Sequence, residues 1–117
     1  MIQWEKCFGG SSFEFASDIQ ELSDQGFVFI GKSSSNDFDV SGNHGYYDYW
    51  IVRSDSLQNI VWENSFGGSK EEWPWCIQQT DDGNFVVAGS ADLDDGDVQG
   101  LHDGTDFWIL KLMTVEI

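Results

Sequence analysis

The segment ADLDDGDV, residues 91–98, carries the densest group of carboxylate side chains in the chain. Carboxylate oxygens are ligands that Ca²⁺ prefers, but an EF-hand loop needs glycine at its sixth position and glutamate at its twelfth. Counted from Asp92, these positions hold Asp97 and Asp103, so the segment is not an EF-hand. It indicates Ca²⁺ as a candidate cofactor, and the alternative is solvated turns in which Asp side chains bond to nearby backbone. The candidate ligands are Asp92, Asp94 and Asp97, with Asn36 and Asp39 in the corresponding earlier segment.

A second group of residues has the chemistry of ligand contact. Flat aromatic rings beside carboxylates suit stacking on a sugar, and EEWPW places two tryptophans next to Glu72. One histidine occurs in each half of the chain, which is too few for a zinc site without further ligands. The alternatives are burial for the tryptophans and structural hydrogen bonding for the histidines. The candidate ligand-binding residues are Trp73, Trp75, Glu72, His44 and His102, and the candidate ligand is a glycan.

Signatures of enzymes are absent from the sequence. It contains no G-x-S-x-G elbow, no phosphate-binding loop and no H-E-x-x-H motif. Carboxylates are so numerous that a pair of them carries no information about acid–base catalysis. We therefore expect a protein that is not an enzyme.

Charge and hydropathy limit the partners. Twenty-one acidic residues against five basic ones give a formal charge of −16, which repels nucleic acid and anionic membranes. The chain has no apolar run long enough for a transmembrane helix. Its first residues, MIQWEK, lack the pattern of a signal peptide, which predicts either a cytoplasmic protein or one whose leader is not part of this sequence. Cys7 and Cys76 are expected to be free thiols, because their repeat counterparts are not cysteines.

These residues lie in two copies of one unit. IQWEKCFGGS at residues 2–11 recurs as IVWENSFGGS at residues 60–69, and the same offset of 58 residues aligns the rest of the chain without a gap. We divide the chain into repeats 1–59 and 60–117. A unit of this size is marginal as an independent core, so the two are expected to stack.

The pattern within each repeat is that of short strands and turns. No helical periodicity competes, and the runs at 27–31 and 85–89 are apolar throughout, as expected for strands covered on both faces. Residues 11–17 and Pro74 are expected in connections. The strands predicted are 2–8, 19–22, 27–31 and 48–52 in the first repeat and 60–66, 76–80, 85–89 and 106–112 in the second.

A repeated four-stranded antiparallel unit that covers both faces by stacking is a blade of a β-propeller. We therefore expect an all-β fold with two such blades in the chain. The alternative is a β-sandwich, whose half-exposed strands should alternate apolar and polar residues more regularly than these do.

The motifs W-x-x-x-F-G-G-S, D-G-x-F-V-V-A-G-S, D-D-G-D-V and D-F-W-I-L-K-L, taken together, resemble a known type of repeat. Repeats of roughly 55 to 60 residues with this pattern occur in bacterial secreted and cell-surface proteins and form β-propellers. The resemblance implies an extracellular or cell-surface location and a role as a module rather than an enzyme. The first repeat departs from the pattern at Gln25-Gly26 and at Phe38, where the second has Gly96.

Two blades cannot close a propeller, which needs about four to eight. In the repeat pattern the strand at 60–66 serves the first unit, so the second unit lacks its equivalent. We expect residues 2–8 to complete the last blade of a neighbouring chain along 107–112, giving a head-to-tail homotrimer or homotetramer of six or eight blades. Small two-repeat lectins that trimerise are similar. The predicted function is a non-catalytic, multivalent, lectin-like module; the alternative is a structural repeat module of a larger surface protein, with no small ligand of its own.

Overall fold

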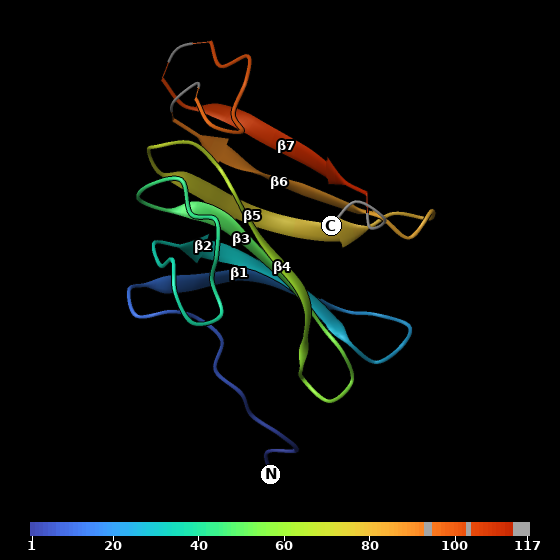
Figure 1. Ribbon diagram of the computed structural model, residues 1–117. Coiled ribbons are helices and arrows are strands. Elements are labelled where there is room, and N and C mark those ends of the chain that lie inside the picture. Colours follow the sequence, from blue (N-terminus) through green and yellow to red (C-terminus); the bar gives the residue numbers. More distant parts are fainter. Residues whose placement is uncertain (93–94, 103, 114–117) are drawn as a thin grey trace.

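The computed structural model describes residues 1–92, 95–102 and 104–113, and within them the chain is all-β, as predicted. The strands form two antiparallel sheets (Figure 1). Sheet 1 has the order β1 (Glu14–Glu21), β2 (Phe27–Ser33), β3 (Asp48–Ser54) and β4 (Ile60–Phe66). Sheet 2 has the order β5 (Glu72–Gln79), β6 (Phe85–Ala91) and β7 (Asp106–Leu112). No helix in the described ranges is long and apolar enough to cross a membrane.

Strand β4 belongs to the second repeat in sequence but to the first sheet in space. It pairs with β3 in antiparallel register, with Tyr49 opposite Phe66 and Arg53 opposite Trp62. Within the described residues sheet 2 therefore has three strands, and β7 forms one of its edges. This confirms the expectation that 60–66 completes the first unit.

The strand expected at residues 2–8 is absent from the structure. Residues 1–8, here called the N-terminal arm, have no strand assignment and lie outside both sheets (Figure 1). The arm instead packs its aromatic side chains on sheet 1, with the ring centroid of Trp4 5.6 Å from that of Phe27 and the centroid of Phe8 4.9 Å from that of Phe29. A strand needs the hydrogen bonds of a neighbouring strand, and these contacts are made by side chains only.

The first strand of each sheet begins earlier than predicted. β1 starts at Glu14 and β5 at Glu72, so the expected connection at 11–17 and the expected loop position of Pro74 were wrong. β5 is an edge strand, and its register shifts between Pro74 and Cys76. Proline is tolerated at such a bulge on an edge, where its missing N–H removes no central ladder bond.

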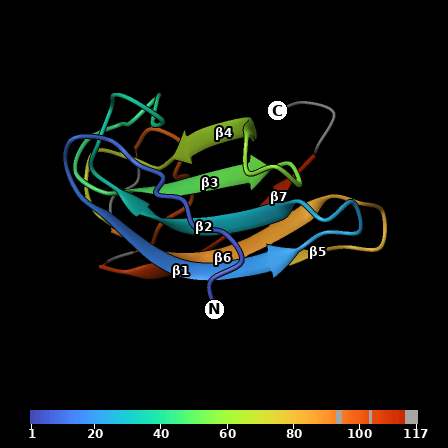
Figure 2. The same ribbon diagram turned by 90° about the horizontal axis from the view of Figure 1, so that it is seen from below.

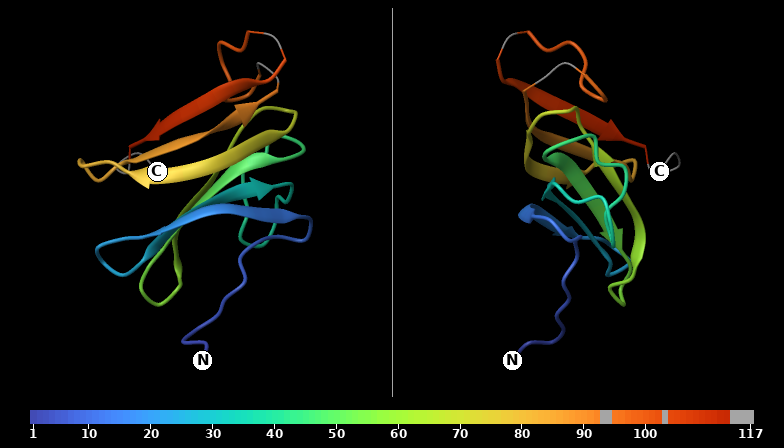
Figure 3. Two further views of the ribbon diagram at one scale, coloured as in Figure 1. Left: turned by 180° about the vertical axis from the view of Figure 1, so that it is seen from behind. Right: turned by 60° about the vertical axis from the view of Figure 1, so that its left-hand side comes forward.

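The two sheets pack face to face, with β1 and β2 lying against β5 (Figures 2 and 3). Tyr49 of β3 is fully buried there: its ring centroid lies 4.8 Å from that of Trp108, and its hydroxyl donates to the Trp108 carbonyl. Other buried side chains of this core include Val28, Ile30 and Ile51 from sheet 1 and Ile77, Phe85 and Val87 from sheet 2.

Sheet 1 is covered on its second face as well. Val40, Trp50 and Val52 form a separate buried cluster there, with Phe8 of the arm packed against it. Five consecutive residues of β3, Asp48 to Val52, are buried, so β3 is enclosed on both sides. The strands predicted to be covered in this way, β2 and β6, instead alternate buried and partly buried residues. Sheet 2 lacks this second cover in the part of the chain that the structure describes.

Candidate functional site

The acidic segments of both repeats are tied to the Gly-Gly-Ser turns. In the first repeat the backbone N–H of Gly9 donates to Asp39 over 2.9 Å and that of Ser11 donates to Asp37 over 2.8 Å. The second repeat makes the same two bonds from Gly67 to Asp97 and from Ser69 to Asp95, at 3.0 and 2.9 Å. These carboxylates therefore stabilise turns, which is the alternative to metal binding given above.

The other predicted calcium ligands have partners within the chain too. Asn36 accepts a hydrogen bond from the Asn43 backbone N–H, and Asp92 accepts one from the Thr105 hydroxyl. Asp94 lies outside the described residues. Across the described ranges, no three His, Cys, Asp or Glu side chains are grouped as a metal site would require. The calcium site stays a prediction without support from this geometry.

Each predicted histidine is held by the aspartate four residues later. The backbone N–H of His44 donates to Asp48, and its Nδ1 lies 2.6 Å from the same carboxylate. His102 makes the equivalent contacts with Asp106, with an Nδ1 distance of 2.8 Å. The Nε2 of His44 also lies 3.5 Å from the Asp97 carboxylate. Both ring nitrogens of His44 thus face carboxylates, which suits a structural role better than that of a free general base.

Asp48 also forms a buried pair of acids with Glu72, across the junction between the sheets. Both residues are fully buried, and Oδ1 of Asp48 and Oε2 of Glu72 have no hydrogen-bond donor. Burial, reinforced by the negative charge of Asp48, raises the pKa of Glu72 to about 8. Burial also raises the pKa of Asp48, against the opposing effect of His44. Burial and the neighbouring acid therefore favour the protonated form of Glu72 at neutral pH.

The surroundings of the pair explain why the carboxyl groups approach so closely. Oε1 of Glu72 accepts the Gly68 backbone N–H over 2.9 Å, and the Glu72 N–H donates to the Tyr47 carbonyl. A Cβ at Gly67 would lie 2.2 Å from Glu72 Oε1 and 2.6 Å from Asp48 Oδ1. Only glycine fits at position 67 without displacing this contact between the sheets.

Glu14, the counterpart of Glu72, has a different environment. It accepts the Gly10 backbone N–H and the hydroxyls of Ser33 and Ser35, all within its own repeat. In the second repeat these two serines are replaced by Ala91 and Leu93. Without the hydroxyls, Glu72 meets Asp48 of the other sheet instead. Sequence reasoning predicted Glu72 as a ligand contact, but the structure places it beneath the surface.

The two predicted tryptophans differ in availability. Trp73 is 39% exposed, and the Lys32 ammonium lies 3.5 Å from its ring centroid and 4.5 Å from that of Tyr47. One face of Trp73 is therefore occupied by a cation–π contact that sequence reasoning missed. Trp75 is 66% exposed. Of the two tryptophans predicted to bind ligand, Trp75 has the more open ring.

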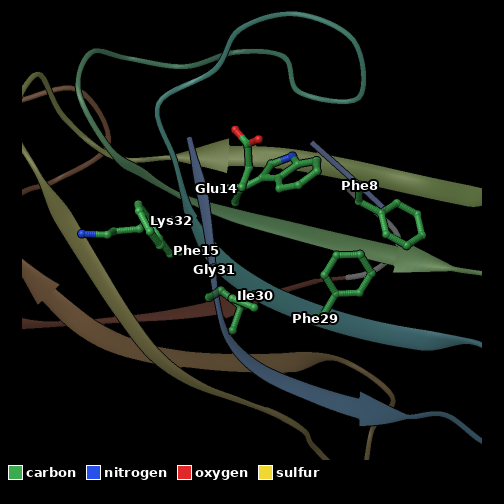
Figure 4. Close-up of a pocket in the computed structure, with 9 residues that line it drawn as sticks. Phe8, Glu14, Phe15, Phe29, Ile30, Gly31 and Lys32 are labelled. Atoms are coloured by element: carbon green, nitrogen blue, oxygen red, sulfur yellow. The ribbon is translucent and has the colours of Figure 1, made fainter. Parts of the chain in front are cut away.

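Two of the hollows beside the arm are lined mainly by apolar side chains. The smaller, of about 70 Å³, is bounded by Phe8 and Phe29 at one end and by Phe15 and Lys32 at the other (Figure 4). It is far smaller than the pockets of several hundred Å³ that hold organic ligands. The larger, of about 340 Å³, is a groove between the arm and β1. Its lining consists of Trp4, Lys6, Phe8, Ala16, Ser17, Asp18, Ile19 and Phe29.

No family model, curated protein or solved structure matches this chain.

The outer face of sheet 2 is the largest difference between the repeats. Phe107 and Ile109 are 90% and 65% exposed there, whereas their counterparts Tyr49 and Ile51 are fully buried between the sheets. The outer side of sheet 1 shows the complementary difference: Ile19 is 58% exposed, and its counterpart Ile77 is buried. The outer face of sheet 2 is thus equivalent to the face of sheet 1 that is buried between the sheets. The outer face of sheet 1 is equivalent to the buried face of sheet 2.

Proposed function

We propose that this chain is a non-catalytic binding module whose two sheets are consecutive blades of a β-propeller, closed by head-to-tail association of several copies. The exposure of Phe107 and Ile109 carries the proposal, because soluble monomers rarely leave such apolar surface uncovered. The packing of sheet 1 against sheet 2 within the chain is the model for how a second copy would cover this surface. A second copy offers the matching surface around its Ile19.

The number of copies follows from the geometry of propellers. Closed rings contain about four to eight blades, and two blades per chain make the total even. Of these even totals we propose six or eight blades, which correspond to a homotrimer or a homotetramer. The contact joins two different surfaces, so it is heterologous and closes only when the rotation between copies permits.

A glycan is the proposed ligand, bound through the exposed ring of Trp75 on β5. Flat apolar rings that are held rigidly suit stacking on sugars. A ring of copies would present this residue three or four times, and several weak contacts then add through their high local concentration.

A structural module without a small ligand is the second candidate. It is favoured by the engagement of Glu72 and His44 in the contact between the sheets. Side chains that fasten one sheet to the next are not free to recognise a sugar.

Light scattering on a sizing column and a glycan array together test the proposal. We expect a particle of three or four chains that binds glycans, and we expect Trp75→Ala to abolish glycan binding without changing the particle mass. Ser17→Ala, at the counterpart position, is the control that should keep binding. A monodisperse monomer would contradict the propeller, while a multimer that binds no glycan would favour the structural module.

A further inference from the structure

The arm packs on sheet 1 in the way that β4 packs on sheet 2. The ring centroids of Trp62 and Phe85 are 6.1 Å apart, and those of their counterparts Trp4 and Phe27 are 5.6 Å apart. The turn that follows each segment is fastened alike, through the paired hydrogen bonds between Gly67 and Asp97 and between Gly9 and Asp39. The arm is therefore held where the outermost strand of a sheet preceding sheet 1 would lie.

Strand β7 is the natural neighbour for such a segment. Its counterpart β3 has two strand partners, β2 and β4, whereas β7 pairs only with β6 among the described residues. An unpaired strand edge presents a row of backbone donors and acceptors that readily takes up another strand. The arm and β7 lie on opposite sides of one chain, so they meet only between copies (Figures 1 and 3).

We propose that residues 2–8 of one copy add to β7 of a second copy as the fourth strand of its sheet 2. This inference rests on the self-association proposed above and specifies its contact. In sheet 1, Tyr49 lies opposite Phe66, Ile51 opposite Asn64 and Arg53 opposite Trp62. Transferred by the repeat offset, this register places Phe107 opposite Phe8, Ile109 opposite Lys6 and Lys111 opposite Trp4.

The side chains at this register complement one another. Within sheet 1 the carboxylate of Glu63 accepts the Trp50 indole N–H over 2.9 Å and the Ser41 backbone N–H over 3.1 Å. The counterpart of Glu63 is Glu5, which is exposed on the arm, and that of Trp50 is Trp108, which is buried in sheet 2. Strand addition gives the indole of Trp108 the carboxylate of Glu5 from the next copy. Buried indoles generally take such a partner.

The groove between the arm and β1 supplies the matching space. Its lining includes Trp4, Phe8 and Ile19, whose counterparts Trp62, Phe66 and Ile77 surround the core between the sheets. That core is filled from the sheet 1 side by residues including Tyr49 and Ile51. In the assembly, Phe107 and Ile109 of the neighbouring copy fill the groove. One association step then covers both of the exposed surfaces and pairs the free edge.

Engineered cysteines at one register pair test the inference. Cys7→Ser and Cys76→Ser remove the native thiols, which are exposed and unpaired. Lys6→Cys and Ile109→Cys then introduce one thiol each at exposed positions, in separate chains. Directly opposed residues on antiparallel strands have the Cα separation that a disulfide needs.

After the two single variants are mixed and oxidised, we expect a covalent dimer on a non-reducing gel. The variant that carries both cysteines should give covalent species of up to three or four chains. Gln3→Cys in place of Lys6→Cys is the off-register control, because position 3 lies three residues before the position that is opposite Ile109 in the proposed register. We expect this control to give much less cross-linked dimer.

Light scattering on the same samples separates the two proposals. A particle of several chains with no more linking at position 6 than at position 3 would overturn strand addition and leave the propeller in place. A monomer by mass, with no linking at either position, would overturn both.

Discussion

The two repeats share a sequence pattern but not an environment. Tyr49 in the first is fully buried against Trp108, and its counterpart Phe107 in the second is almost wholly exposed. Both positions lie at the same place on equivalent strands, with aromatic side chains at each. Whether a position of the repeat is buried in the core is therefore decided by the neighbouring sheet rather than by the strand itself.

The acidic residues at positions 14 and 72 also differ in their environment. Glu14 is satisfied by hydroxyls of its own repeat, whereas Glu72 shares a buried site with an acid from the other sheet. The second repeat lacks the two serines, and its glutamate instead contacts an acid of the other sheet and has a raised pKa.

The largest expected difference is between alanine substitutions at Tyr49 and at Phe107, in their effect on the free energy of unfolding. Tyr49→Ala should lower the free energy of unfolding by about 3–5 kcal/mol, because it leaves a cavity between the sheets and removes the bond to the Trp108 carbonyl. Phe107→Ala should change the free energy of unfolding by less than about 0.5 kcal/mol when the chain is diluted to a monomer. Urea denaturation measures both, and equal losses would show that the two repeats are buried alike.

The raised pKa of Glu72 predicts that stability depends on pH near neutrality. In the unfolded chain Glu72 takes its ordinary pKa of 4.5, and in the folded chain its pKa is about 8. Between these values the folded chain binds more protons, so the free energy of unfolding should fall as pH rises from about 4.5 to about 8. Glu72→Gln should flatten this slope and raise the melting temperature by several degrees above about pH 8, measured by calorimetry. A slope that is unchanged in Glu72→Gln would refute a buried, protonated Glu72.

Glu14→Gln should have the opposite sign at neutral pH. It replaces a charged acceptor of two hydroxyls and one N–H, and it should lower the free energy of unfolding by about 1–2 kcal/mol. The same calorimetry at pH 7 measures it. Stabilisation by Glu14→Gln would show that the two repeats treat this acid alike after all.

The smallest effect comes from the hairpin turns between the first two strands of each sheet. Gln25 has φ +69° and its counterpart Gly83 has φ +83°, a region that favours glycine. Gln25→Gly should stabilise the chain by up to about 1 kcal/mol, and Gly83→Gln should destabilise it by about 1 kcal/mol. Thermal melts of the two variants check the pair, which should shift in opposite directions.

Those parts of the fold that depend on local sequence patterns or on the repeat could be predicted from the sequence. The spacing of the repeats assigned Ile60–Phe66 to the first sheet, and alternating aromatic and β-branched residues gave Asp106–Leu112 with the observed bounds. Residues 2–8 have the same strand pattern as β4 but no strand edge beside them in the described chain. The starts of β1 and β5 were placed too late, because a bulge interrupts their alternation at Ala16 and Pro74.

The candidate site was less accessible to sequence reasoning, since its contacts join distant residues. Glu14 and Glu72 each accept the N–H of the second glycine of the Gly-Gly-Ser turn, a contact between residues only four apart in the sequence. The approach of Asp48 to Glu72 depends on how the sheets stack, and no spacing encodes it. One signal was present in the sequence: Ala91 stands in the second repeat where the first has Ser33, and this removes one hydroxyl partner of the acid that recurs at positions 14 and 72.

The docked arm has a consequence for the speed of assembly. Trp4 and Phe8 already rest on Phe27 and Phe29 in the single chain, so the arm loses its conformational freedom when the chain folds. Copies that meet would then dock as preformed bodies, without a slow ordering step after encounter. The association rate should fall in the ordinary range of about 10⁵–10⁷ M⁻¹s⁻¹ and should rise with salt, because every copy carries the same large negative charge.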